Sequence, residues 1–403
     1  MRIAFTANGP GEVAGWLRPL LRSLYRQSPD LVPFVFLVPD DYATGFEAEM
    51  VREAFPAAVV YEPKSYLKFA LGGRLDGLPP SVDVVQYIGG DLLHARRLHA
   101  RLKGRAATYK FSRRAYRKVF DRAFAVDRRN VEQLEAWGTA RERIDQVGNL
   151  AIDGALFEAA LSDEVTAPDG IVIMPGSRTY EIENLVPFYF AVALRILRER
   201  PEIPIAFAIS PFTPRPQVRA AIEGGGHPRM FATRGRFVSE EGRDYLTSPT
   251  GEIRIPVLAN ALAAAARARL VLTIPGTKTI ELAALGKPAI ALTPLNAPEL
   301  VTINGPLTYL NRIPFFGIPL KRAVAVGVSR HFPHHTQPNM DASTSLIREV
   351  HGAVTPGRIA RVALEAFDDR AWLAATSESL AALYRDHVGA SDRMAQSLLA
   401  LAG

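Results

Sequence analysis

Two short loops in the second half of the chain have the composition of phosphate-binding sites. Each follows an apolar run and joins a glycine to a hydroxyl and a cation: Gly176-Ser177-Arg178 in the first, and Gly276-Thr277-Lys278-Thr279 in the second. A helical pattern follows each loop, so the backbone N–H groups at its start can bind an anion. Glycine lets the anion approach the backbone, and the cation adds charge. The pair predicts a bound nucleotide diphosphate.

We expect Glu281 to lie in the first helical turn after the second loop. Its carboxylate can accept hydrogen bonds from two ribose hydroxyls beside the phosphates, which extends the nucleotide hypothesis. Two alternatives remain at this point: a glutamate that only complements the helix dipole, and loops that are ordinary strand-to-helix turns. Neither loop has the spacing of a Walker A motif or of a dinucleotide fingerprint.

The first half of the chain has a glycine loop of its own, Asn8-Gly9-Pro10-Gly11-Glu12, directly after the first apolar run. A second, Gly89-Gly90-Asp91, follows a later one. Gly9 and Gly11 are expected to form the floor of an acceptor site, with Asp91 or Glu12 as the general base. The alternative for Asp91 is a helix cap or turn residue.

Strand and helix patterns alternate along the chain, which predicts an α/β protein with parallel sheets in two doubly wound domains. The boundaries are expected at 1–160 and 168–365, with a C-terminal segment at 366–403. The expected strands cover 3–7, 32–38, 59–61, 82–88, 123–126, 146–148, 171–174, 205–209, 270–274 and 289–292, and the clearest helices cover 182–200 and 259–268.

The composition indicates a globular cytoplasmic enzyme. The 403 residues are 48% hydrophobic and include no cysteine, which excludes disulfides and thiol nucleophiles. No apolar stretch of about 18 residues is present, and the N-terminus lacks a signal-peptide pattern. A histidine group, His331, His334 and His335, favours a loop over a metal site, so no metal is expected.

The net charge of +7 comes from one basic cluster. Ten cations and no acid lie between Asp91 and Asp121: Arg96, Arg97, Arg101, Lys103, Arg105, Lys110, Arg113, Arg114, Arg117 and Lys118. An anionic membrane surface, nucleic acid and a solvated helix face are the three interpretations. Residues 306–322 and 64–71, which are apolar and aromatic, favour peripheral contact with the inner face of a membrane, and nucleic acid is not the expected partner.

At three places the chain resembles the lipid-A-disaccharide synthase family. Pro175-Gly176-Ser177-Arg178 with Glu181-Ile182 is similar to that family's Pro-Gly-Ser-Arg-x-x-Glu-Ile pattern. The segment from Gly276 to Glu281, followed by Leu285-Gly286-Lys287-Pro288, is similar to its Ser-Gly-Thr-Ala-Thr-x-Glu segment, and Gln337-Pro338-Asn339 is similar to its Leu-Pro-Asn.

The resemblance implies a GT-B glycosyltransferase with two Rossmann-like domains facing each other across a cleft. Such an enzyme would move an N-acetylglucosamine-like or acylated glucosamine unit from a UDP-sugar to a hydroxyl of a lipid-like acceptor. Arg178 and residues 276–279 would hold the diphosphate, Glu281 the ribose, and Asn339 would belong to the donor site. No cofactor or metal is implied. The helices of 366–403 would pack on the N-terminal domain or on a partner subunit in a homodimer.

The departures from the family lie mainly in the first half. The family has two acids where this chain has only Asp91, and it has Ser-Gly-Asp where this chain has Pro10-Gly11-Glu12. Pro275 and Lys278 replace serine and alanine in the second loop. We therefore expect the same kind of donor and a different acceptor. Two alternatives are a UDP-sugar epimerase or hydrolase on the same scaffold, and a non-catalytic protein that binds through the basic cluster.

Overall fold

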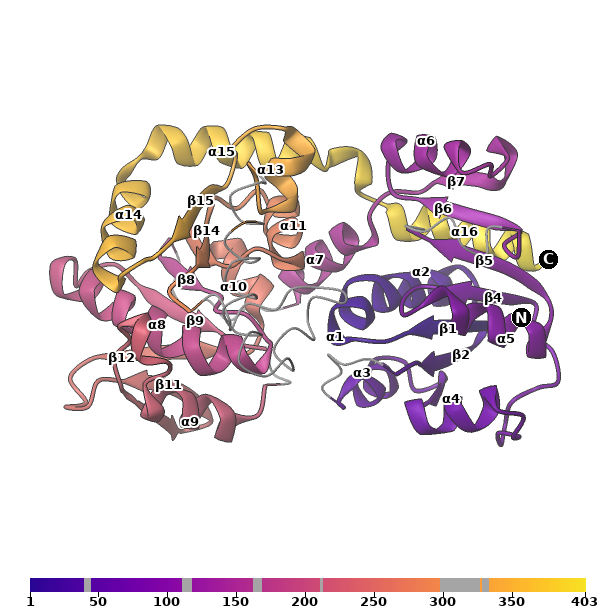
Figure 1. Cartoon of the computed structure of the whole chain (residues 1–403), viewed down its shortest axis with the longest axis horizontal. Helices are drawn as coiled ribbons and strands as arrows, with labels where there is room; N and C mark the ends of the chain where they lie inside the picture. Colours follow the sequence, from indigo (N-terminus) through magenta and orange to yellow (C-terminus); the bar gives the residue numbers. More distant parts are fainter. Residues whose placement is uncertain (40–44, 111–117, 162–168, 211–212, 298–326, 328–332) are drawn as a thin grey trace. The chain divides into compact units, whose positions relative to one another are not determined.

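The computed structural model describes residues 1–39, 45–110, 118–161, 169–210, 213–297, 327 and 333–403. It divides into two compact units (Figure 1), one of residues 1–154 with 385–403 and one of residues 155–384. The chain crosses from the first unit to the second within helix α7 (Leu150–Ala160), and it returns to the first unit after Tyr384. The second unit thus extends past residue 365, where the sequence analysis placed its end.

The first unit is built on a parallel sheet of seven strands, in the order β3-β2-β1-β4-β5-β6-β7. The strands are β1 (Arg2–Ala7), β2 (Val32–Leu37), β3 (Val59–Tyr61), β4 (Val84–Tyr87), β5 (Arg105–Tyr109), β6 (Arg122–Ala125) and β7 (Ile144–Gln146). Their residues are mostly buried, as expected for strands covered on both faces. The strand order changes direction between β1 and β4, and such switch points bind ligands in doubly wound folds.

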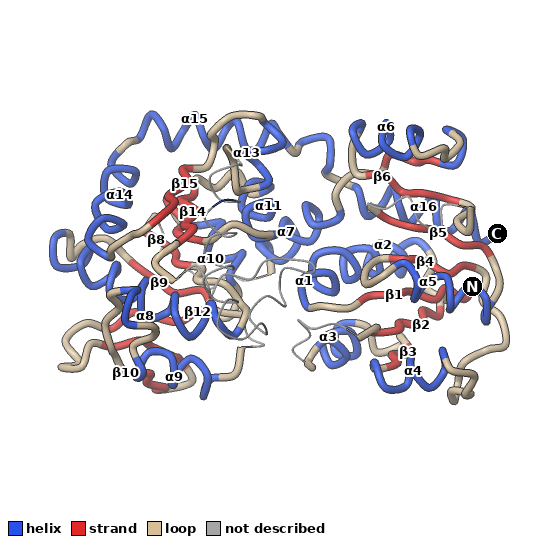
Figure 2. The backbone as a smooth tube through the Cα atoms, viewed as in Figure 1, coloured by secondary structure: helices blue, strands red, loops and turns tan. Residues whose placement is uncertain are grey.

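Helices cover this sheet (Figure 2): α1 (Pro10–Glu12), α2 (Arg18–Gln27), α3 (Glu47–Ala54), α4 (Pro63–Ala70), α5 (Leu92–Leu102), α6 (Arg128–Ala136) and α16 (Ala390–Ala402). A π-helical turn, Val13–Leu17, joins α1 to α2. The C-terminal helix α16 is fixed to this unit because the Asp153 carboxylate accepts hydrogen bonds from Gly389 N and Ser391 N, at 2.7 and 2.6 Å.

The second unit has a sheet of eight strands, in the order β10-β11-β12-β9-β8-β13-β14-β15. They are β8 (Ile171–Ile173), β9 (Ile205–Ala208), β10 (Arg236–Glu240), β11 (Arg243–Thr247), β12 (Arg254–Leu258), β13 (Leu270–Thr273), β14 (Ala289–Pro294) and β15 (Arg348–Gly352). Strand β11 is antiparallel to both of its neighbours, β10 and β12, so the expectation of purely parallel pairing is wrong at this edge. The two-residue turn Glu241-Gly242, with positive φ at both residues, makes the β10–β11 hairpin.

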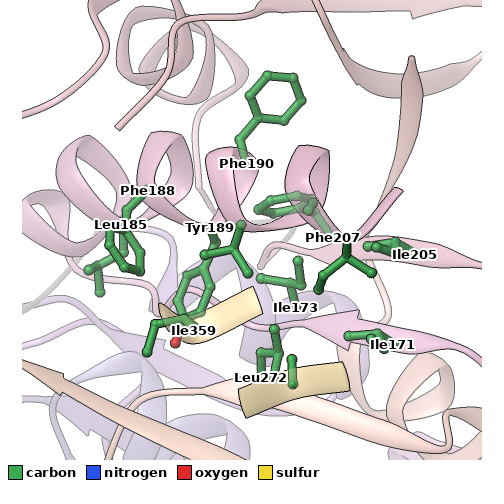
Figure 3. Close-up of a cluster of buried hydrophobic side chains, with 14 of the residues drawn as sticks. Ile171, Ile173, Leu185, Phe188, Tyr189, Phe190, Ile205, Phe207, Leu272 and Ile359 are labelled. Carbon is green, nitrogen blue, oxygen red and sulfur yellow. The ribbon is translucent and has the colours of Figure 1, made fainter. Parts of the chain in front are cut away.

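Its helices are α8 (Thr179–Glu199), α9 (Arg215–Gly224), α10 (Ala261–Arg267), α11 (Thr277–Ala284), α13 (Gln337–Ala342), α14 (Pro356–Asp368) and α15 (Arg370–Leu383). Figure 3 shows how α8 packs on the sheet, with Phe188 and Tyr189 in one buried cluster with Ile359 of α14. Helix α8 is buried along most of its length, which explains its continuous apolar sequence. This packing fixes the start of α8, where the first glycine loop ends.

Among the described residues, no helix is long and apolar enough to cross a membrane.

Candidate active site

The two glycine loops follow neighbouring strands of the second sheet. Strands β8 and β13 pair in parallel, with Ile171 opposite Leu270 and Ile173 opposite Leu272. The strand order changes direction between these two strands, so both loops leave the sheet at its switch point. The fold therefore brings together two segments that lie a hundred residues apart in the sequence.

The two loops share a seven-residue pattern, Pro-Gly-Ser/Thr-Arg/Lys-Thr-x-Glu, over residues 175–181 and 275–281. The sequence analysis used their glycines, hydroxyls and cations, and assigned a role to Glu281 only. The repeat is the signal that would have identified Glu181 as its counterpart. The structure shows that the two glutamates are held in different ways.

In the first loop, the Glu181 carboxylate occupies the backbone donors. Its Oε2 accepts hydrogen bonds from Ser177 N at 2.8 Å and Arg178 N at 3.0 Å, and the side chain is 7% exposed. This is the glutamate half of a capping box at the start of α8. A Cβ at Gly176 would lie 2.2 Å from the same oxygen. The glycine is thus required by the position of the glutamate.

The second loop has no such cap. The N-cap of helix α11 is Gly276, which has no side chain, and Glu281 Oε2 accepts a hydrogen bond from Lys278 Nζ at 2.6 Å. Glu281 is the fifth residue of α11, past the first turn where the sequence analysis expected it, and its side chain is 7% exposed. A Cβ at Gly276 would meet no atom of the described residues within 4 Å. This loop therefore combines open space, a helix N-terminus, a cation and a buried carboxylate.

A buried tyrosine connects the two loops. Tyr189 of α8 donates a hydrogen bond through its hydroxyl to Thr273 O at 2.7 Å, at the end of β13. Burial raises the pKa of Tyr189 far above its ordinary value, so the phenol keeps its proton. Helix α8 begins after the first loop and β13 ends before the second, so this bond joins the elements that carry the two loops.

Asn339, predicted to belong to the donor site, is fully buried on α13. Its Nδ2 donates to Ile347 O and to Glu349 Oε1, each at 2.8 Å, and its Oδ1 accepts from Leu346 N and Ile347 N at 2.9 and 2.8 Å. These bonds attach α13 to the start of β15. A direct contact with the donor stays a prediction.

Glu349 organises the segment around the predicted histidine group. Burial by itself would raise its pKa, but hydrogen bonds from Thr336 and from His335 N outweigh burial and lower the pKa. The rings of His335 and His351 lie 4.1 Å apart, and burial lowers the pKa of His351. Within the described part of the chain, no group of side chains could hold a metal ion. His331 lies outside that part.

In the first unit, Glu12 follows β1 and Gly89 follows β4, the two strands at the switch point. The Glu12 carboxylate lies against the Gly89 backbone, since a Cβ at Gly89 would be 1.5 Å from Glu12 Oε2. Asn8 N donates to the same oxygen at 3.3 Å. Gly9 begins the helix by accepting from Glu12 N and Val13 N through its carbonyl, whereas exposed Gly11 leaves open space beside it.

Asp91 is exposed and caps helix α5, because its Oδ1 accepts a hydrogen bond from Leu93 N at 2.8 Å. The structure therefore confirms the alternative interpretation of Asp91 as a helix cap. The cap uses one of the two carboxylate oxygens, so a role as general base stays a prediction.

Sequence reasoning did not select His94, in the first turn of α5. Its Nδ1 lies 2.6 Å from the hydroxyl of fully buried Tyr66. Burial lowers the pKa of His94 below its ordinary value of 6.5, Asp91 opposes this effect and Arg97 adds to it. One signal in the sequence could have identified it: His94 comes three residues after Asp91, which follows a central strand.

Several cations of the basic cluster serve the fold. Arg101 donates to the carbonyls of Phe69 and Gly73, and its guanidinium lies 4.0 Å from the Phe69 ring centroid. Arg105 pairs with Asp121 at 3.5 Å, and Lys110 Nζ lies 5.3 Å from the centroid of a Trp16 ring. Residues 111–117 of the cluster lie outside the described residues.

The two predicted membrane segments have different outcomes. Residues 306–322 lie outside the described residues. In α4 and the residue that follows it, Tyr66 and Phe69 belong to the core, while Leu67 and Leu71 are exposed. Membrane contact therefore stays a prediction.

The fold is shared with known enzymes along nearly the whole chain. The S. aureus MnaA–UDP complex has a TM-score of 0.61 at 15% identity, covering 99% of this chain and 97% of that one. The UDP-GlcNAc 2-epimerase of Neisseria meningitidis bound to UDP-GlcNAc has a TM-score of 0.52 at 11% identity, covering 99% and 100%. The glycotransferase of kitacinnamycin has a TM-score of 0.51 at 14% identity, covering 99% and 98%.

No protein-family model matches the chain, and no curated protein matches it in sequence. At these identities the structural similarity establishes the fold alone. It confirms the predicted α/β class with two Rossmann-like domains of the GT-B type.

Proposed function

We propose that this protein is an enzyme acting on a UDP-sugar, with the diphosphate bound at the second glycine loop. The observation that carries the proposal is the start of α11, which has no side-chain cap, with Lys278 beside it and the buried Glu281 paired to Lys278 one turn further along the helix. Structures of similar fold support it, because the S. aureus and N. meningitidis proteins are seen with UDP or UDP-GlcNAc.

The chemistry follows from the loop. Backbone N–H groups at the start of α11 and the Lys278 ammonium would stabilise the charge of the departing UDP. Thr277 would adjoin the phosphates, and Glu281 would accept hydrogen bonds from the ribose hydroxyls. Thr279, also predicted to bind the donor, is fully buried and donates its hydroxyl to Gly276 O at 2.7 Å, so it would hold the turn instead. Ser177 and Arg178 of the neighbouring loop would take a secondary part, since Glu181 already engages their N–H groups.

The reaction we propose first is epimerisation of the UDP-sugar at a ring carbon, in the manner of a UDP-GlcNAc 2-epimerase. Inverting C2, which bears a hydrogen, requires one group to remove that proton while the C1–O bond to UDP breaks and a C1=C2 double bond forms. A second group then returns a proton to the opposite face of C2 while UDP adds back to C1. Glu12 and Asp91, which follow the two switch-point strands of the first sheet, are the proposed pair. Hydrolysis of the UDP-sugar would use the same site with water.

Glycosyl transfer is the second candidate. The repeated Pro-Gly loops and their resemblance to the lipid-A-disaccharide synthase favour it, and so does the fold shared with the kitacinnamycin glycotransferase. In this case Asp91 or Glu12 would be the general base, and Gly9 and Gly11 would adjoin the acceptor. A lipid-like acceptor, a membrane surface and a homodimer belong to this second proposal.

The test is to incubate the full chain with UDP-GlcNAc and follow the sugar and phosphorus resonances by NMR. An epimerase gives a second UDP-N-acetylhexosamine, and a hydrolase gives UDP and free sugar. A transferase gives neither until an acceptor is added. Calorimetric titration with UDP, using ADP and GDP as controls, tests the nucleotide site by itself. Absence of binding by all three nucleotides would refute the proposal.

A pair of variants tests the proposed proton-transfer groups. We expect Asp91→Asn or Glu12→Gln to lower turnover by roughly a hundredfold or more, the usual contribution of general acid–base catalysis, with UDP affinity unchanged. Glu49→Gln, an exposed glutamate on α3, is the matched control. The melting temperature must be measured as well, because Asp91 also caps α5. Full turnover in either variant would remove that residue from the mechanism.

A further inference from the structure

A buried tyrosine and a histidine form a hydrogen-bonded pair at the carboxyl edge of the first sheet. The Tyr66 hydroxyl lies 2.6 Å from His94 Nδ1, and the two rings meet edge to face with centroids 5.1 Å apart. Tyr66 is fully buried on α4, and His94 is half-buried in the first turn of α5. The pair connects the two helices beside the switch point of this unit.

The surroundings of Tyr66 fix the direction of this hydrogen bond. A buried phenol proton requires an acceptor, and His94 Nδ1, at 2.6 Å, lies within reach to be that acceptor. Arg97 also contacts the phenol oxygen, and a guanidinium can only donate, so that oxygen accepts from Arg97. Nδ1 is thus unprotonated, and the proton of the neutral imidazole lies on Nε2.

The Nε2 edge of the ring lies beside the glycine turn that follows β4. A Cβ at Gly90, whose φ is +86°, would lie 3.8 Å from His94 Cδ2 and 2.4 Å from Val38 Cγ2. Cδ2 is bonded to Nε2, so this edge lies alongside the Gly90 backbone. The Glu12 carboxylate lies against the adjacent Gly89.

We infer that His94 is a ligand-binding residue whose Nε2–H donates a hydrogen bond to an oxygen of a carbohydrate at this edge of the first sheet. The inference rests on the proposed action on a UDP-sugar and names a binding group for its sugar. A sugar hydroxyl both donates and accepts hydrogen bonds. His94 Nε2–H supplies a donor, and the Glu12 and Asp91 carboxylates supply acceptors. The same two carboxylates would repel an anionic ligand, so this edge favours a neutral sugar.

Because Nε2 carries a proton, His94 is not the group that removes one from the substrate. It is a binding group, and Tyr66 is a positioning residue that fixes its tautomer. This separates His94 from Asp91 and Glu12, the proposed proton-transfer groups.

The first measurement is the tautomer of His94 in the full chain, by long-range ¹H–¹⁵N correlation of its histidines at pH 7. The signal is assigned by its loss in His94→Gln. We expect the neutral Nε2–H form in the wild type and a shift toward the other tautomer in Tyr66→Phe. A wild-type His94 that is protonated on Nδ1, or charged, would overturn the inference whether or not the proposed function holds.

The second measurement adds ligand. We expect the His94 Nε2 resonance to move with saturating UDP-GlcNAc and to stay in place with UDP, since only the first carries a sugar. Binding of UDP-GlcNAc with an unchanged His94 resonance overturns this inference alone. If calorimetry shows that UDP-GlcNAc does not bind, the proposed function fails, and the ligand assigned to His94 fails with it.

Variants give an independent readout. His94→Ala should weaken binding of UDP-GlcNAc roughly tenfold relative to UDP, the loss expected for one hydrogen bond. His94→Gln, which retains an N–H at a similar reach, should restore most of that loss. His99→Gln on the same helix, whose Nε2 lies 3.1 Å from Gly104 O, is the matched control. Equal affinities in His94→Ala and the wild type, with both folded, would contradict the inference.

Discussion

The two glycine loops of the second unit share a sequence pattern and a place in the fold, but they use their glutamates in opposite ways. Glu181 reaches back to Ser177 N and Arg178 N and completes its own helix cap. Glu281 bonds to Lys278 instead, at the start of a helix without a side-chain cap. A shared motif thus yields one loop whose donors are engaged by its own glutamate and one whose helix start has no side-chain cap among the described residues.

The largest expected difference between the loops is in nucleotide affinity. Glu281→Ala should weaken UDP binding roughly ten- to hundredfold, because hydrogen bonds to a charged group contribute about 1.5–3 kcal/mol. Calorimetric titration at 25 °C measures this. Glu183→Ala, an exposed glutamate on α8, should bind UDP like the wild type. Unchanged affinity in Glu281→Ala would remove this residue from the site.

The counterpart in the first loop should affect stability. Glu181→Ala leaves two backbone donors of a helix start without their acceptor, and we expect a loss of about 1–3 kcal/mol in the free energy of unfolding. Urea denaturation of the wild type and both glutamate variants measures this. UDP affinity in folded Glu181→Ala should fall less than in Glu281→Ala. The reverse order would show that the first loop is the principal phosphate site.

Tyr189→Phe tests whether the loops are coupled. The variant removes the hydroxyl that donates to Thr273 O, so the free energy of unfolding should fall by about 1 kcal/mol. If the bond sets the position of the second loop, UDP affinity should also fall by several-fold. If Tyr189→Phe is less stable but binds UDP as tightly as the wild type, the bond stabilises the core and does not position the second loop.

The smallest expected effect is that of Lys278→Ala. Its side chain is 46% exposed, so water and salt screen its charge, and we expect a loss of less than about 1 kcal/mol in UDP binding. The difference from the wild type should shrink as sodium chloride is raised in the calorimeter. A larger loss that is insensitive to salt would show that Lys278 is buried against the phosphate in the complex.

Much of the fold could be predicted from the sequence, because apolar runs between glycine and proline turns are local signals. Strand β3 matches its predicted range, and β1 and β2 differ from theirs by one residue at one end. Strand β5 was not predicted, because its short apolar run lies among Arg105 and the other cations of the basic cluster and gives no clear strand pattern. Its Ala106, Ala107 and Tyr109 are buried by pairing with β4 and β6, which no local pattern encodes.

The candidate site was predicted in part. The glycines, cations and Glu281 stood out because phosphate chemistry requires those residue types close together in the sequence. His94 and Tyr66 did not, since they are 28 residues apart and become a pair only through the packing of α4 and α5. In the structure, Asn339 makes hydrogen bonds within the fold, a role that the sequence analysis did not give it. Asp91 caps a helix, a role that the sequence analysis considered only as an alternative.

The sequence by itself determined the alternation of strands and helices and the residue types at each turn, because these depend on interactions between near neighbours. Only the tertiary structure decided that Ile171 pairs with Leu270, and that Glu181 faces backbone while Glu281 faces Lys278. Strand order depends on hydrogen bonds between distant segments. The direction of a carboxylate depends on which donors the completed fold brings within reach.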